Sequence, residues 1–135
     1  MEEGQMTEDR RAGQLLAAAL EESGHSGEAP RVVLDRRAYQ RGRELGEAAR
    51  ADNGAVVDVL EAHGYEPRGD GGGISLVNCP IHSLAKAHTE LVCEMNLQLL
   101  HGVLHGLADT GMTAALRPTP EQCCVSIEPA GTEQA

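Results

Sequence analysis

The chain has 135 residues, of which 41% are hydrophobic, and a formal net charge of −10 at pH 7. This length fits one domain, and because the chain lacks Phe and Trp and has only two Tyr, its core must be almost entirely aliphatic. The negative charge argues against direct binding of nucleic acid, which relies on Lys and Arg contacts to phosphate.

The sequence also lacks the signals of secretion and membrane insertion. No basic segment followed by a hydrophobic run opens the chain, and no stretch approaches the roughly 18 to 20 apolar residues that span a bilayer. We therefore expect a cytoplasmic protein whose four cysteines are reduced.

The first part of the chain predicts two helices. Apolar residues at helical spacing indicate a first helix from near Asp9 to Ser23, followed by a linker over residues 23–30 that is rich in Gly, Ser and Pro. Asp35 suits the N-cap of a second helix over residues 36–50. We interpret the six Arg in and just before this helix as a solvated face.

A third helix and a hairpin are predicted next. The helix runs from just after Gly54 to His63, which we interpret as an exposed or capping side chain, and Gly64 is well placed as its C-terminal cap. Strands at residues 65–68 and 74–77 then flank a loop of five residues that is rich in glycine.

The long apolar segment after the hairpin decides whether its cysteines can meet. In one straight helix, Cys79 and Cys93 would lie roughly 21 Å apart, at about 1.5 Å per residue. Thr89 is a good N-cap, and the acidic residue after it suits the first turn of a helix. We therefore predict a break there, with a short helix over residues 81–87 and a longer one over residues 90–107, which brings Cys93 back toward Cys79.

Two strands are predicted at the C-terminal end. They cover residues 112–117 and 122–128, with a turn at residues 118–121. Alternation along the second strand puts its odd-numbered positions on the core face, including Cys123, whereas Cys124 points the other way. If these cysteines bind a metal, we prefer Cys123 as the ligand and keep Cys124 as the alternative.

Cys and His side chains from these separate elements are candidate ligands of one metal site. Three thiolates and one imidazole form a soft tetrahedral set that suits zinc, and the same residues could hold an iron–sulfur cluster. His101 and His105 share a helix face at a spacing that can also bind a metal, but we interpret them as surface residues. The candidate ligands are Cys79, His82, Cys93 and either Cys123 or Cys124.

Three motifs carry a resemblance to a known family: NCPIHSLA at residues 78–85, HTELVC at 88–93 and CCV at 123–125. They resemble the C-terminal effector region of bacterial winged-helix transcriptional regulators of the ArsR-like or DeoR-like kind, which include the iron–sulfur-sensing repressors of the Suf operon. The resemblance covers roughly residues 35–128. It implies a non-catalytic sensory domain, similar to the vinyl-reductase-like ligand-binding domains, whose Cys and His residues bind zinc or an iron–sulfur cluster.

The expected organisation combines the elements with the resemblance. The fold class is α+β, in which N-terminal helices precede a small antiparallel sheet packed against a long helix. We expect an acidic N-terminal segment with one helix and a linker over residues 1–34, a metal-binding effector domain over residues 35–129 and a disordered tail over residues 130–135. Because the chain has no room for the winged helix that reads DNA in such regulators, we expect it to act as a homodimer or through a partner DNA-binding protein.

Two other functions are compatible with the sequence. The segment from Arg36 to Val77 could itself form a small winged helix, although its reader helix would carry Asp58 and Glu61 and no basic residue. Alternatively, Cys79 could be the nucleophile of a thiol-based enzyme, activated by a helix N-terminus and by His82.

Overall fold

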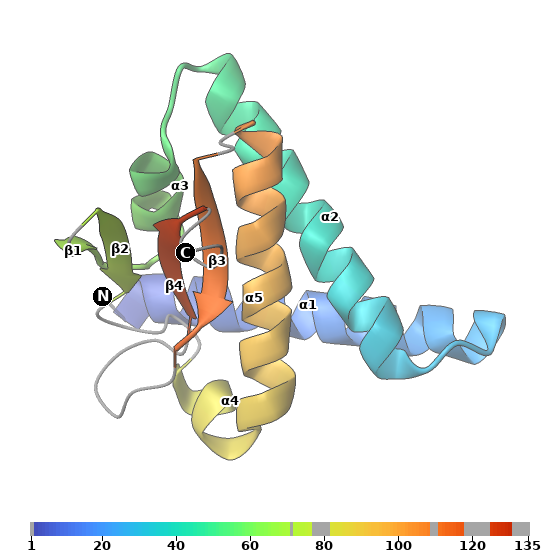
Figure 1. Ribbon diagram of the computed structural model, residues 1–135. Helices are drawn as coiled ribbons and strands as arrows, with labels where there is room; N and C mark the ends of the chain where they lie inside the picture. The colour runs from blue at the N-terminus through green and yellow to red at the C-terminus, as the bar shows by residue number, and fades with distance from the viewer. Residues whose placement is uncertain (1, 71, 77–81, 109–110, 118–124, 131–135) are drawn as a thin grey trace.

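The computed structural model describes residues 2–70, 72–76, 82–108, 111–117 and 125–130. Along the described residues, three helices are followed by two strands, two more helices and two more strands (Figure 1). The elements are α1 (Glu2–Ser26), α2 (Pro30–Ala51), α3 (Val56–Ala62), β1 (Pro67–Asp70), β2 (Gly73–Leu76), α4 (His82–Ala87), α5 (Thr89–Gly106), β3 (Met112–Leu116) and β4 (Val125–Pro129).

The four described strands form one antiparallel sheet in the order β1-β2-β4-β3. The long helix α5 packs on this sheet through β3 and β4, and α2 covers the other side of α5 (Figure 1). Helix α1 crosses behind α2 and α5 in this view and packs against α2. This arrangement confirms the predicted α+β class. None of the helices in the described ranges is both long enough and apolar enough to cross a membrane.

The core has two parts, and α5 contributes residues to both. One part joins α5 to the sheet and α3, and the other joins α5 to α1 and α2. Tyr65, 6% exposed, is the one aromatic residue among the buried side chains of the described residues, so the core is aliphatic as expected. The most buried side chains include Val33, Leu34, Leu60, Leu100, Leu104, Val125 and Ile127.

Helices α2 and α5 approach each other through glycines on both sides. A Cβ atom added at Gly42 or Gly46 would collide with the backbone of α5, and one added at Gly102 or Gly106 would collide with the backbone of α2. Each pair is spaced by four residues, so both of its glycines lie on the same face of their helix. The close approach is therefore reciprocal, because glycines of each helix contact the backbone of the other.

The first two helices are longer than predicted. Helix α1 ends at Ser26, where Gly27 has a φ of +80° and donates its N–H to the Ser23 carbonyl at 3.0 Å. Helix α2 begins at Pro30, because proline has the φ angle of a first helical residue and needs no N–H partner there. The predicted linker is therefore reduced to residues 27–29. The prediction that Asp35 is the N-cap of this helix was wrong, because Asp35 lies inside α2 and the N-cap is Ala29. The expected domain boundary after residue 34 also falls within α2.

The third helix ends as the sequence predicts. Gly64 has a φ of +86°, and the N–H groups of Gly64 and Tyr65 donate to the carbonyls of Glu61 and Leu60. This is the double hydrogen-bond pattern of a Schellman cap, and it requires a residue that tolerates positive φ. The hairpin that follows is tighter than predicted, because Asp70 pairs with Gly73 and the strands extend into the expected loop.

The predicted helix break is confirmed. Helix α4 ends at Ala87 and α5 begins at Thr89, with His88 at the N-cap position, one residue before the predicted cap. The Thr89 hydroxyl donates to the Ala85 carbonyl at 2.9 Å, which ties the two helices together. The break itself lies at His88, whose φ of −135° and ψ of 59° are not helical.

The C-terminal strands agree with the predicted alternation where they are described. In β4 the side chains of Val125 and Ile127 are 0% and 1% exposed, so the odd-numbered positions face the core. The predicted turn at residues 118–121 and the first residues of the second predicted strand, including Cys123 and Cys124, lie outside the described residues.

Candidate functional site

Cys93 is the one predicted metal ligand whose side chain the structure describes. It lies at the start of the second turn of α5, is 8% exposed, and forms a disulfide bond. The expectation of four reduced thiols therefore does not hold at this residue. The sulfur of Cys93 is therefore bonded directly to the sulfur of a second cysteine.

The other predicted ligands are not placed by the structure. His82 opens α4, but its side chain is not described, and Cys79, Cys123 and Cys124 lie outside the described ranges. Within those ranges, no group of three or more His, Cys, Asp and Glu side chains could hold a metal ion. The predicted ligand set therefore stays a prediction.

The elements next to the predicted ligands do lie near each other. Helix α4 packs against α5, and Figure 1 shows β3 ending toward the α4 end of α5. Leu116 at the end of β3 pairs with Val125 at the start of β4, so β4 begins at this same end of the sheet. Three chain segments that lead to or from predicted ligands therefore share one end of the molecule.

Asp35 of α2 is a partly buried carboxylate that interacts electrostatically with Glu94 of α5. One side-chain oxygen of Asp35, Oδ1, is buried without a hydrogen-bond partner among the described residues. Burial raises the pKa of Asp35 above its ordinary value, and the negative charge of Glu94 raises it further, while Arg31 acts in the opposite direction. Glu94 follows Cys93 directly in α5.

The two histidines of α5 have protein partners. The Nε2 atom of His101 lies 3.0 Å from the Ala114 carbonyl oxygen, and the Nδ1 atom of His105 lies 2.5 Å from the Tyr39 hydroxyl. Their rings are stacked, with centroids 6.4 Å apart. These contacts join α5 to β3 and to α2, so the pair has a structural role.

A second candidate site is a cavity of about 340 Å³ between α1, α2 and α5. Its polar groups come from four parts of the chain, and sequence reasoning assigned none of them to a site. The arginines of α2 were interpreted as a solvated face and His63 as a capping residue. The available signal was the spacing of Arg37, Arg41 and Leu45, which puts all three on one face of α2.

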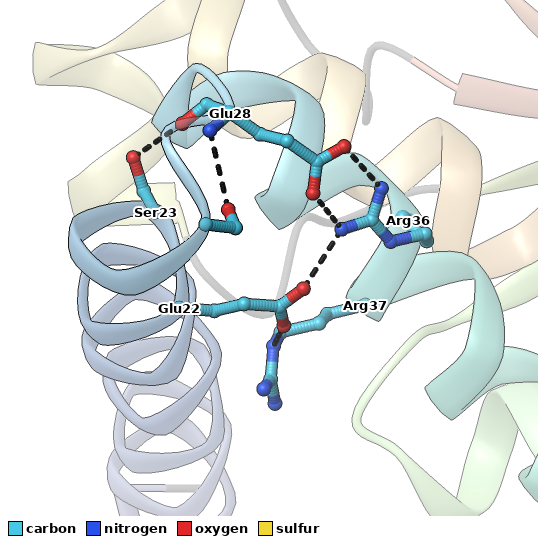
Figure 2. Close-up of polar contacts among 6 residues, drawn as sticks. Glu22, Ser23, Glu28, Arg36 and Arg37 are labelled. Atoms are coloured by element: carbon cyan, nitrogen blue, oxygen red, sulfur yellow. Dashed lines mark hydrogen bonds and ion pairs between the residues drawn. The ribbon is translucent and has the colours of Figure 1, made fainter.

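Ion pairs join α1 and the connection after it to α2 (Figure 2), and Arg37, one of the arginines involved, also lines the cavity. Glu22 of α1 accepts hydrogen bonds from Arg36 at 2.8 Å and from Arg37 at 2.7 Å, and Glu28 accepts two more from Arg36 at 2.7 and 3.0 Å. The hydrogen bonds to Arg36 and Arg37 lower the pKa of Glu22, and that to Arg36 lowers the pKa of Glu28. The Ser23 hydroxyl also donates to the Glu28 carbonyl at 2.5 Å, which shapes the connection between the helices.

Comparisons with known proteins add no homology to this geometry. A scan against protein-family models finds no match, and searches of curated proteins and of solved structures find none either. The resemblance to winged-helix regulators therefore remains a prediction from the three motifs.

Proposed function

We propose that the chain is a non-catalytic sensory domain of a transcriptional regulator, whose cysteines report metal or redox state. The observation that carries the proposal is Cys93, a buried cysteine that is already joined to a second sulfur at the start of α5. Paired buried thiols are typical of metal sites and of redox-responsive disulfides.

The donor chemistry fits a soft metal site. Thiolate sulfur and imidazole nitrogen are the donors that zinc prefers and that can hold iron–sulfur clusters. In the reduced protein, Cys79, His82, Cys93 and either Cys123 or Cys124 would hold the metal group. The group would join α4, α5 and the start of β4, so we expect its loss to loosen the packing of the C-terminal half.

The disulfide gives the same residues a second state. Reduction by a thiol reductant supplies two electrons and two protons, which converts the disulfide into two thiols. Metal binding then releases these protons, because the ligands are thiolates. In the oxidised domain the sulfur of Cys93 is in a disulfide and is not available to a metal, whereas in the reduced domain Cys93 can bind the metal as a thiolate.

The signal would pass to a second copy of the chain or to a DNA-binding partner, because the chain's acidity disfavours direct contact with DNA. Leu20 on α1 and Val32 on α2 are large apolar side chains that are 62% and 53% exposed. They are the first positions to test for a contact with a partner.

The test is metal analysis of protein purified without air, with and without a thiol reductant. We expect the reduced protein to hold about one zinc ion per chain without colour, or iron and acid-labile sulfide with a brown chromophore. The Cys93→Ser variant should lose the metal, and of Cys123→Ser and Cys124→Ser only one should do so. Reduced protein that holds neither zinc nor iron and sulfide, and has four titratable thiols and an intact fold, would exclude the metal site.

The same preparations test the enzyme alternative. Metal ligation predicts that the thiol of Cys79 is protected from alkylation in metal-loaded protein. Rapid and selective alkylation of Cys79 under these conditions would instead support a nucleophile.

A further inference from the structure

We propose that the cavity between α1, α2 and α5 binds a small organic anion with an apolar body, whose charged group is held by Arg37 and Arg41. Cys93, the one predicted metal ligand whose side chain is described, does not line this cavity, so the site is argued independently of the proposed cysteine site. The proposal therefore stands whether or not the chain binds a metal.

The size of the cavity suits a small molecule. Cavities that bind such ligands usually enclose about 300–1,000 Å³. The cavity here has about 340 Å³ and is lined by residues of α1, α2 and α5, together with His63 and Tyr65 after α3. A ligand of modest length would fill it.

The charge of the lining is opposite to that of the protein. The chain has 21 acidic and 11 basic residues, yet the described residues that line the cavity include three arginines and no Asp or Glu. The arginines are Arg11 on α1 and Arg37 and Arg41 on α2. A positive site in a negative protein selects an anion, and the surrounding charge repels anions that it does not hold specifically.

The arginines of α2 keep donors for a ligand. Arg37 uses only its Nε atom to bind Glu22, and its two other nitrogens point away from that carboxylate in Figure 2. Arg41 has one ion pair, with Glu44 at 3.6 Å, and both of these side chains are largely exposed, so the pair is weak. Both guanidinium groups can therefore bind a carboxylate or a phosphate.

The cavity has apolar walls and two hydrogen-bonded polar pairs, of which Arg11 with His63 is one. Leu15, Leu99 and Met95 supply aliphatic walls, and the Tyr65 hydroxyl donates to the Asn96 side-chain oxygen in the buried floor. A ligand with its charge at the half-exposed arginines and its hydrocarbon part against these walls would match the lining along its whole length.

Binding can be tested with three probes of equal chain length: decanoate, decanol and decylamine. Isothermal titration of the full chain should detect decanoate, with decanol at least about tenfold weaker because it lacks the charge-assisted bonds, and no binding of decylamine. Arg41→Gln should weaken decanoate binding by about tenfold. The matched control is Arg43→Gln, because Arg43 lies on the same helix, pairs with Glu47 at 3.4 Å and does not line the cavity.

Three results would overturn the proposal. Equal affinity for decanoate and decanol would mean that the cavity does not recognise charge. Equal losses from Arg41→Gln and Arg43→Gln would mean that decanoate responds only to the general charge of α2. No binding of decanoate at millimolar concentration would exclude the site. Octyl phosphate, titrated in parallel, distinguishes a carboxylate from a phosphate as the preferred group.

Discussion

The reciprocal glycine contact between α2 and α5 makes Gly102→Ala a sharp test of the fold. In an exposed helix interior, Gly→Ala stabilises by about 1 kcal/mol because alanine loses less backbone entropy. At Gly102 the new Cβ would collide with the Tyr39 carbonyl oxygen and lie 2.8 Å from the Arg43 backbone nitrogen. These neighbours are backbone atoms, so they cannot rotate away as a side chain can.

The expected magnitude follows from the two opposing effects. Overpacking of a tight contact costs about 1–3 kcal/mol, and the upper end applies where backbone must move, so we expect a net loss of about 2 kcal/mol after the helix-propensity gain. The matched control is Gly13→Ala in α1, where an added Cβ meets nothing within 4 Å and should stabilise by about 0.5–1 kcal/mol.

Urea unfolding followed by circular dichroism measures both variants, in the same redox state of Cys93. One separation of the helices relieves both clashes, so Gly42→Ala combined with Gly102→Ala should cost less than the sum of the single variants. Stabilisation by Gly102→Ala equal to that of Gly13→Ala would refute the close approach of the two helices.

Three further changes test the polar groups. Asp35→Asn should stabilise the protein by about 1 kcal/mol at neutral pH, because it removes a charge that burial and Glu94 disfavour. The pKa of Asp35 is raised in the folded protein. Below pH 3.8, its ordinary pKa, Asp35 is protonated in both the folded and the unfolded protein, so unfolding curves there should show no gain from Asp35→Asn. Tyr65→Phe should cost about 1–2 kcal/mol in the same assay, because the buried Asn96 oxygen loses its donor, and an unchanged midpoint would contradict this. Glu22→Gln should speed hydrogen exchange in α1 at neutral pH. The wild type should show the same loosening as pH falls below 4.5 through the lowered pKa of Glu22, and pH-independent exchange protection would count against the ion pairs.

Local chemistry made several boundaries predictable. The end of α3 follows from Gly64, which tolerates positive φ, and the break before α5 was predicted to within one residue, although its N-cap is His88 and not Thr89. The start of α2 was missed because Pro30 sits in a stretch that is typical of a linker. Proline is also a good first helical residue, and only the burial of Val33 and Leu34 by α1 and α5 decides between the two interpretations.

The candidate sites were predictable to different degrees. The predicted helix break turned Cys93 toward Cys79 as a reduced metal ligand, whereas Cys93 forms a disulfide, and the other three cysteines lie outside the described residues. The whole cavity could not be predicted, because local spacing relates only Arg37, Arg41 and Leu45, and the rest of its lining comes from three other parts of the chain. An arginine such as Arg41 has the same sequence context whether it faces bulk water or the mouth of a cavity.

The glycines of α2 and α5 also account for the composition of the chain. A protein with two tyrosines as its only aromatic residues has little large side-chain volume with which to fill a wide gap between helices. Direct contact of the two backbones at Gly42, Gly46, Gly102 and Gly106 removes most of that gap. These contacts freeze no side-chain rotamers, because glycine has none to lose. The two helices therefore meet through backbone atoms at these glycines, and their leucines and valines fill the space around this contact in both parts of the core.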